Sequence, residues 1–232
     1  HTRLQGDWSS DVCSSDLTDV KVNVDQAGLV TGTGTYDVSD TASKIEAEAA
    51  KTNAGVLDNA DDVSANATVT LTVAEYKALD DANTDLLTAY NIVDTEANVR
   101  AEIDTSAPTS AGVLDGAANV QVVQDPNATP LVYQVIDLSV GELRALNTAT
   151  VSLGSGHNVK DSVAALFDGN GDVVAEVTSG TPVFVIGLIN QAQFDKLGVA
   201  NGAAAVDAPQ LDPTADSHTD GNLSITVDVY DK

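Results

Sequence analysis

The sequence predicts an α/β protein in which tandem β-α repeats form a solenoid-like, mainly parallel array with a more β-rich C-terminal part. The hexamer Tyr36–Thr41 recurs as Tyr90–Thr95 and, more weakly, as His157–Ser162, and such self-similarity is typical of repeat architectures. Apolar stretches with the two-residue period of a half-buried strand lie directly before helix-start signals. Only 4% of the residues are aromatic, so we expect thin stacked layers rather than one large globule.

Two longer segments recur with the hexamer. Ala54–Asp58 returns as Ala111–Asp115, and Leu71–Leu79 returns as Leu138–Leu146, with Asn190–Leu197 as a third and weaker copy. Because the second segment starts as a strand and continues as a helix, each repeat predicts the order β-α-β-α. Small, separate α+β modules in a row are the alternative architecture.

Helix starts are marked in both clear copies of the longer segment. Thr72 with Glu75, and Ser139 with Glu142, have the spacing of a capping box. In this motif the two side chains accept hydrogen bonds from the first backbone amides of the helix. We therefore predict that helices begin at these two positions.

The repeats divide the chain into segments with different roles. The segments are 1–17, a non-native artefact; 18–35, an N-terminal strand and turn; 36–89, the first repeat; 90–155, the second repeat; 156–205, a degenerate third repeat; and 206–232, a linker and terminal strand. The other predicted elements are a strand with Val20, Val22 and Val24; a strand with Val69, Leu71 and Val73; a strand with Val132, Val135, Ile136 and Leu138; a hairpin over 166–174; a strand over 183–186 covered on both faces; a loop over 206–221; and a strand over 223–229.

The first residues are excluded from the fold prediction. Asp7–Leu17 resembles the conceptual translation of a short-read sequencing adapter, and non-native segments do not inform a fold; a polar N-terminal tail is the alternative. The exclusion removes Cys13, the only cysteine, and Trp8, the only tryptophan. We expect an environmental fragment without its native start, in which Lys232 is either a native end or the end of the fragment.

The charge restricts the partners that we expect. The formal net charge is −25 at pH 7, and a chain this acidic repels nucleic acid phosphates and anionic membrane surfaces. No apolar run approaches the roughly 20 residues that span a bilayer. We therefore expect no nucleic acid partner and no membrane insertion of this segment.

One acidic loop is a candidate metal site. Asp168, Asn170 and Asp172 place oxygen atoms at every second position, a spacing that calcium loops use. The full EF-hand pattern is absent, because Val173 stands at the position of the sharp-turn glycine and Ser179 at that of the bidentate glutamate. A plain hairpin turn is the alternative. We expect no required cofactor, and calcium is the candidate ion.

Aspartates recur at one place in each repeat. Asp40, Asp94 and Asp161 are each followed by Thr or Ser. An array of ligand sites is one interpretation. The structural interpretation is a helix cap or an Asx turn, in which Asp40 or Thr41 caps the helix that follows.

Histidines and asparagines offer weaker candidates. His157 and His218 lie far apart without cysteine, and a zinc site needs more ligands; His157 replaces Tyr36 and Tyr90, which predicts half-buried packing. Asn66-Ala67-Thr68 and Asn127-Ala128-Thr129 fit the glycosylation acceptor pattern, and turn chemistry is the alternative interpretation.

The complete repeat resembles a known kind of protein. Its pattern, Tyr-x-Val/Ile-x-Asp-Thr, then Ala-Gly-Val-Leu-Asp, then Leu-Thr/Ser-Val-x-Glu-x-Lys/Arg-Ala-Leu, is similar to repeats of very large secreted bacterial surface proteins, namely type I-secreted adhesins and surface-layer proteins. The likeness covers about residues 36–200. It implies an extracellular or cell-surface location and neighbouring repeats of the same larger protein as partners. The glycine-rich calcium array of those relatives is absent from this chain.

These observations predict a non-catalytic structural or spacer segment of an exported bacterial surface protein, either an adhesin or a surface coat. The sequence offers no constellation of nucleophile, base and orienting group. A glycan- or protein-binding module along the repeat face is the alternative, with Tyr36, Tyr90 and Tyr133 as its candidate contact residues. A polysaccharide-active enzyme is the third interpretation.

Overall fold

The computed structural model describes residues 20–30, 35–82, 84–103, 105, 111–178, 180–200, 206–207 and 210–211. The chain forms two compact units. The first unit holds the residues up to Val99 together with Gly116–Val132, and the second holds Arg100–Asp115 and the residues from Tyr133 onward. Every strand pair in the described part of the chain is parallel, so the predicted mixed α/β class with parallel strands is confirmed.

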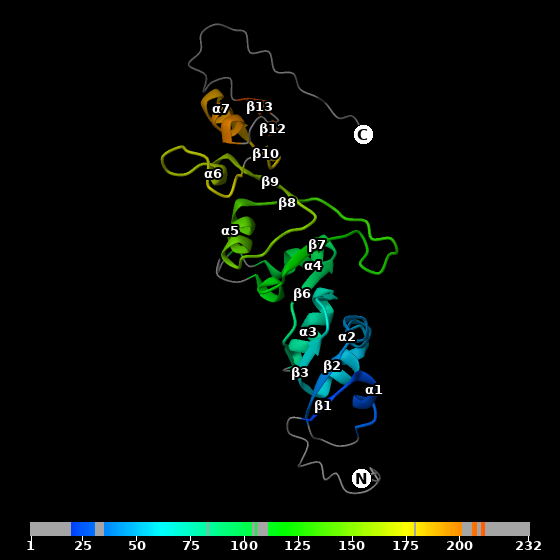
Figure 1. Cartoon of the computed structure of the whole chain (residues 1–232). Helices are drawn as coiled ribbons and strands as arrows, with labels where there is room; N and C mark the ends of the chain where they lie inside the picture. The colour runs from blue at the N-terminus through cyan, green and yellow to red at the C-terminus, as the bar shows by residue number, and fades with distance from the viewer. Residues whose placement is uncertain are drawn as a thin grey trace, which may run out of the picture. The chain divides into compact units, whose positions relative to one another are not determined.

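The described strands of the first unit form two sheets, and neighbouring strands within each sheet are parallel (Figure 1). In spatial order, one sheet consists of β1 (Lys21–Val22), β2 (Tyr36–Asp40), β3 (Ala60–Ala65) and β5 (Asp85–Leu86), and the other of β4 (Val69–Leu71), β6 (Tyr90–Asp94) and β7 (Asn119–Val122). The helical elements are α1 (Val24–Ala27), α2 (Ala42–Ala49), η1 (Thr52–Asn59), α3 (Val73–Asp81) and the first residues of α4 (Glu96–Glu102).

The second unit repeats this type of organisation. One sheet consists of β8 (Ile136–Leu138), β9 (His157–Ser162), β10 (Val183–Ile186) and β12 (Val206–Asp207), and the other of β11 (Leu188–Ile189) and β13 (Gln210–Leu211). The helical elements are the end of α4, η2 (Gly112–Leu114), α5 (Val140–Thr148), α6 (Val163–Leu166) and α7 (Gln191–Ala200).

The three hexamers take the same place in their sheets. Strands β2, β6 and β9 each pair with a short strand that ends just before a helix N-cap. The register is also the same, because the third hexamer residue lies opposite the last residue of that short strand: Val38 with Val22, Ile92 with Leu71 and Val159 with Leu138. Segments Val69–Leu71 and Ile136–Leu138 therefore occupy equivalent positions.

The core consists mainly of medium-sized aliphatic side chains. Alternate residues point inward at the start of β2 and of β6, as the two-residue period of a strand requires, whereas Ile92, Val93 and Asp94 of β6 are all buried. Val38 and Ile92 are fully buried, and Tyr36 and Tyr90 are 4% and 7% exposed. The largest fully buried side chains are Ile45, Leu57, Leu71, Leu79, Ile92, Leu114, Ile136, Leu138, Leu146, Leu166, Ile189 and Leu197.

Two predicted strands extend too far in the N-terminal half. The predicted strand through Val24 is wrong, because β1 ends at Val22 and Val24 is the first residue of α1. Val73 likewise begins α3 instead of continuing β4. In both cases the residue before the valine caps a helix, and this local hydrogen bonding overrides the alternating pattern.

Three predictions in the C-terminal half also change. Val132 and Val135 are 52% and 59% exposed and lie outside β8, so the strand predicted there is shorter than expected and keeps only Ile136 and Leu138. Ile186 is 56% exposed, so the strand over 183–186 is not covered on both faces throughout. The segment 206–221 contains the short strands β12 and β13. The predicted strand over 223–229 lies outside the described residues.

The α-helices of the described residues are short, from 4 residues in α1 to 10 in α7. Within the described residues, no helix has the length and hydropathy needed to cross a membrane.

Candidate functional site

Polar chemistry concentrates where helices begin. Of the helices that the structure describes, four start with a capping box. In this motif the N-cap side chain accepts a hydrogen bond from the third helical amide, and the side chain at that third position accepts one from the N-cap amide. The pairs are Asn23 with Gln26 (2.8 and 3.0 Å), Thr72 with Glu75 (3.2 and 2.7 Å), Ser139 with Glu142 (3.2 and 2.7 Å) and Asn190 with Gln193 (2.9 and 3.1 Å). The two helix starts predicted from the sequence are confirmed.

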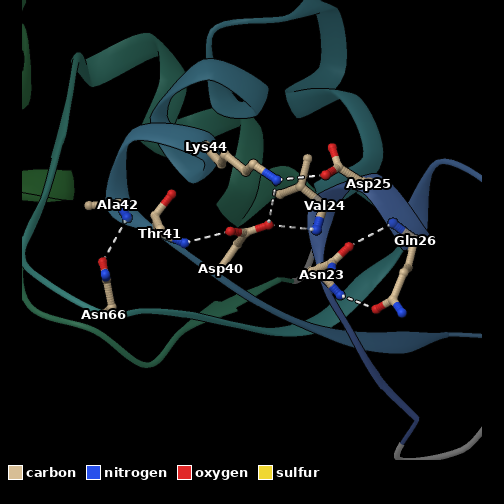
Figure 2. Close-up of polar contacts among 9 residues, drawn as sticks. All are labelled: Asn23, Val24, Asp25, Gln26, Asp40, Thr41, Ala42, Lys44 and Asn66. Atoms are coloured by element: carbon tan, nitrogen blue, oxygen red, sulfur yellow. Dashed lines mark hydrogen bonds and ion pairs between the residues drawn. The ribbon is translucent and has the colours of Figure 1, made fainter.

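The recurring aspartates lie beside three of these helix starts. In each of Asp40, Asp94 and Asp161, atom Oδ1 accepts the N–H of the following residue at 2.7 Å. Atom Oδ2 accepts a hydrogen bond from the first amide of the helix that precedes the hexamer strand. The distances from this amide nitrogen to Oδ2 are 3.1 Å for Val24, 2.9 Å for Val73 and 3.0 Å for Val140. Figure 2 shows this arrangement around Asp40.

This geometry confirms the structural interpretation of the three aspartates. Both oxygens of each carboxylate accept hydrogen bonds from backbone amides, including one orphan amide at a helix N-terminus. The predicted partner differs, however. The carboxylate of Asp40 holds the start of α1, and not that of α2, which follows it in the chain.

Helix α2 begins in a different way. Its N-cap residue, Thr41, makes no side-chain capping bond. Instead, the first amide of α2, that of Ala42, donates to Oδ1 of Asn66 at 3.1 Å (Figure 2). Asn66 follows β3, the strand that pairs with β2, so a neutral amide takes the place that an aspartate has elsewhere. The predicted glycosylation motif at this residue thus has a structural role.

Charge around Asp40 favours the ionised carboxylate. The backbone amide of Thr41 lowers the pKa of Asp40, and the amide of Val24 and the nearby Lys44 ammonium act in the same direction. The Nζ atom of Lys44 lies 3.5 Å from Asp40 Oδ2 and 2.7 Å from Asp25 Oδ2. Residues of α1, β2 and α2 thus meet in one polar cluster.

The acidic loop between α6 and β10 is a hairpin turn. Phe167 and Val173 form an antiparallel bridge. Within the turn, Oδ1 of Asp168 accepts the amides of Asn170 and Asp172, both at 2.9 Å. These bonds lower the pKa of Asp168, with the Asp172 amide as the largest cause and the Asn170 amide next. The predicted hairpin is confirmed.

A cation of the chain itself lies on this turn. The Nζ atom of Lys196, in α7, lies 2.9 Å from Asp172 Oδ1 and also contacts the carbonyl oxygen of Gly171. Among the residues that the structure describes, no group of three or more His, Cys, Asp or Glu side chains is arranged to hold a metal ion. Calcium binding by Asp168, Asn170 and Asp172 stays a prediction.

The histidine and the second asparagine motif have ordinary surroundings. His157 is half-buried and lies opposite Ile136, as Tyr90 lies opposite Val69, so the predicted packing position is confirmed. Burial lowers its pKa. Asn127 is exposed in a turn, where its amide donates to Asp125 Oδ1 at 2.9 Å. His218 lies outside the described residues.

Sequence reasoning missed two buried glutamates. Glu48 and Glu102 are 6% and 9% exposed. Their Oε2 atoms accept the amides of Val56 at 3.2 Å and Val113 at 3.3 Å. In both cases the donor is the valine of the recurring Ala-Gly-Val-Leu-Asp segment. The glycine before it has a positive φ, 58° for Gly55 and 56° for Gly112. A Glu three residues after a buried Ile45 or Val99 was the available signal.

Comparison with protein-family models, with curated proteins and with solved structures finds no match.

Proposed function

We propose that this chain is a non-catalytic spacer segment of an exported bacterial surface protein, built from tandem β-α repeats in a solenoid-like array. One observation carries the proposal. A helix start whose first amide is bound by the aspartate of the hexamer, in the same strand register, occurs three times. Repeated units of this kind give length and extended surface. Neighbouring copies of the unit are the expected partners, in an adhesin or a surface coat.

The use of the acidic groups supports this proposal. Asp40, Asp94 and Asp161 bind backbone amides, and Glu48 and Glu102 do the same at the glycine turns. These carboxylates hold backbone in place, which is the requirement of a structural segment. The net charge of −25 suits a saline exterior, where screening is strong.

A binding module is the second candidate. Two of the three tyrosines expected to contact a glycan or a cell-surface partner, Tyr36 and Tyr90, lie in the core. Tyr133 is 53% exposed, and Val135 close by is 59% exposed. These two side chains favour a protein or glycan contact at this one segment, and not along the whole repeat face.

A display experiment tests the spacer. One, two or three copies of the chain are placed in series between a membrane anchor and a fluorescent reporter on bacterial cells. The height of the reporter above the membrane is then measured. A spacer raises the height in proportion to the number of copies, whereas flexible glycine-serine linkers of matched length raise it only with the square root.

The same material tests the alternatives. Square-root growth in height would overturn the spacer proposal. The purified chain is also incubated with a panel of glycans, followed by measurement of binding and of cleavage products. Cleavage would show an enzyme, and binding that is lost in Tyr133→Ala but retained in Tyr76→Ala would show a glycan-binding module.

A further inference from the structure

The strand order of the first unit contains a return. Along the chain, β5 lies between β4 and β6, which pair with each other in one sheet. However, β5 itself pairs with β3, in the other sheet, with Asp85 opposite Asp62 and Leu86 opposite Val63. The chain therefore leaves the first sheet, forms one strand and one helix of the second, and returns before it completes the second.

The second unit has the same return. Along the chain, β12 lies between β11 and β13, which pair with each other. However, β12 pairs with β10, with Val206 opposite Val183 and Asp207 opposite Phe184. Both units thus use a helix, α3 or α7, followed by a short strand that closes the preceding sheet.

The returning segment of the first unit is bound to β3 of the first sheet and to η1, which leads into β3. The buried hydroxyl of Thr84 lies 3.0 Å from the carbonyl oxygen of Leu57 and 2.9 Å from that of Ala60. The amide of Leu87 donates to the carbonyl of Val63 at 2.9 Å, and Thr88 Oγ1 accepts the amide of Ala65 at 2.7 Å.

The same segment is tied to the second sheet through α3. The amide of Thr84 donates to the carbonyl of Leu79 at the end of α3 (3.0 Å), and α3 begins directly after β4. A separate contact joins α2 to β4, because Glu46 Oε1 accepts the amide of Thr70 at 2.7 Å. Release of β5 from the first sheet would therefore free the end of a helix that belongs to the second.

We infer that the returning strand β5 makes the two sheets of the first unit unfold together as one cooperative unit, and that β12 does the same in the second unit. A chain of independent modules would open sheet by sheet, as locally cooperative units often do. Here the connection between β4 and β6 passes through the first sheet, so neither sheet opens alone. This inference goes beyond the proposed spacer role and does not depend on it.

Hydrogen exchange of the full chain tests the coupling. The substitution Tyr36→Phe removes the bond of 2.7 Å from the hydroxyl of Tyr36, in β2 of the first sheet, to the carbonyl of Val56 in η1, and leaves the second sheet untouched. The readouts are amides with backbone partners: Asp37 and Asn66 report on the first sheet, and Val69 and Ala118 on the second. The expected result is a loss of protection of roughly two- to tenfold at all four amides. A loss confined to Asp37 and Asn66 would overturn the inference.

A matched pair of variants tests the role of β5 itself. Leu87 is 65% exposed, so Leu87→Pro mainly removes its amide bond to Val63, and Leu87→Ala shortens the same side chain but keeps the bond. Tyr36→Phe is then repeated in both backgrounds. In Leu87→Ala the loss still spreads to all four amides, and in Leu87→Pro it is confined to Asp37 and Asn66. Spread to all four in Leu87→Pro would show that β5 is not the coupling element. The first experiment decides the inference even if Leu87→Pro fails to fold.

Discussion

Helices α3 and α2 lie in the same unit and begin in different ways. The first amide of α3 is bound by the carboxylate of Asp94, which is 1% exposed, and the helix also has its own capping box. The first amide of α2 is bound by the neutral and exposed Asn66, and its N-cap side chain makes no bond. In both helices the acceptor lies at the end of the next parallel strand, as the last residue of β6 for Asp94 and as the first residue after β3 for Asn66. The strand arrangement therefore fixes where the acceptor lies, and the residue type sets the charge and the energy.

The largest expected effect comes from removal of the carboxylate that binds the first amide of α3. Asp94 accepts the amides of Val73 and Thr95 and the side-chain amide of Asn98, at 2.9, 2.7 and 2.7 Å. Asp94→Ala leaves the buried amide of Val73 and two part-buried donors without acceptors and should lower the free energy of unfolding by about 2–4 kcal/mol. Asn66→Ala, the matched change at α2, removes one exposed bond and should cost about 0.5–1 kcal/mol. Urea denaturation measures both, and equal losses would contradict the comparison.

The comparison also shows what the sequence could predict. The hexamer was found because its sequence repeats. The capping boxes of Thr72 and Ser139 were found from local spacing, because their hydrogen bonds join residues three positions apart. The partner of Asp40 could not be found in this way. Its carboxylate accepts the amide of Val24, which follows the neighbouring strand β1, and the register of the two strands decides this contact. Val24 and Val73 were assigned to strands, since an alternating pattern does not show where a cap interrupts it.

Features that depend on burial were the least predictable. Glu48 and Glu102 are charged residues in helical segments, and charged side chains are almost never fully buried unless paired, yet each is buried and accepts an amide of a glycine turn. A Cβ atom added to Gly55 would lie 2.3 Å from Glu48 Oε2. These bonds join residues 8 and 11 positions apart, a separation that no helix-capping pattern covers. The aspartates of the 168–172 turn were found as a cluster, but the approach of Lys196 from α7 was not.

The second prediction concerns acid. Because the amide of Thr41 lowers the pKa of folded Asp40 below 3.8, its stabilising contribution is present above pH 3.8 and is lost as the pH falls through the folded pKa. Asp40→Asn should cost about 1 kcal/mol at pH 7 and make the decline in stability below about pH 5 less steep. Asp37→Asn, the same charge change on the same strand, is the control. An unchanged acid profile in Asp40→Asn would contradict the prediction.

The third prediction converts the neutral helix start into a charged one. Asn66→Asp places a carboxylate beside the first amide of α2, and negative charge at a helix N-terminus stabilises by about 0.3–1 kcal/mol. The gain should appear in urea denaturation at pH 7 and disappear at pH 3. Asn127→Asp adds the same charge in an exposed turn and should give no gain. A loss of stability in Asn66→Asp that matches the one in Asn127→Asp would show that general repulsion dominates.

The smallest expected effect lies in the third hexamer, where His157 takes the place of Tyr36 and Tyr90. Burial lowers the pKa of His157 below 6.5, so the folded state binds this proton less readily than the unfolded state. Stability is therefore greatest above pH 6.5 and falls as the pH drops from 6.5 to the folded pKa. His157→Gln, which keeps a polar side chain but does not titrate, should abolish the difference in urea midpoint between pH 5 and pH 7.5. His157→Tyr restores the residue of the other two hexamers and should do the same. A pH difference that persists unchanged in both variants would assign this titration to another group.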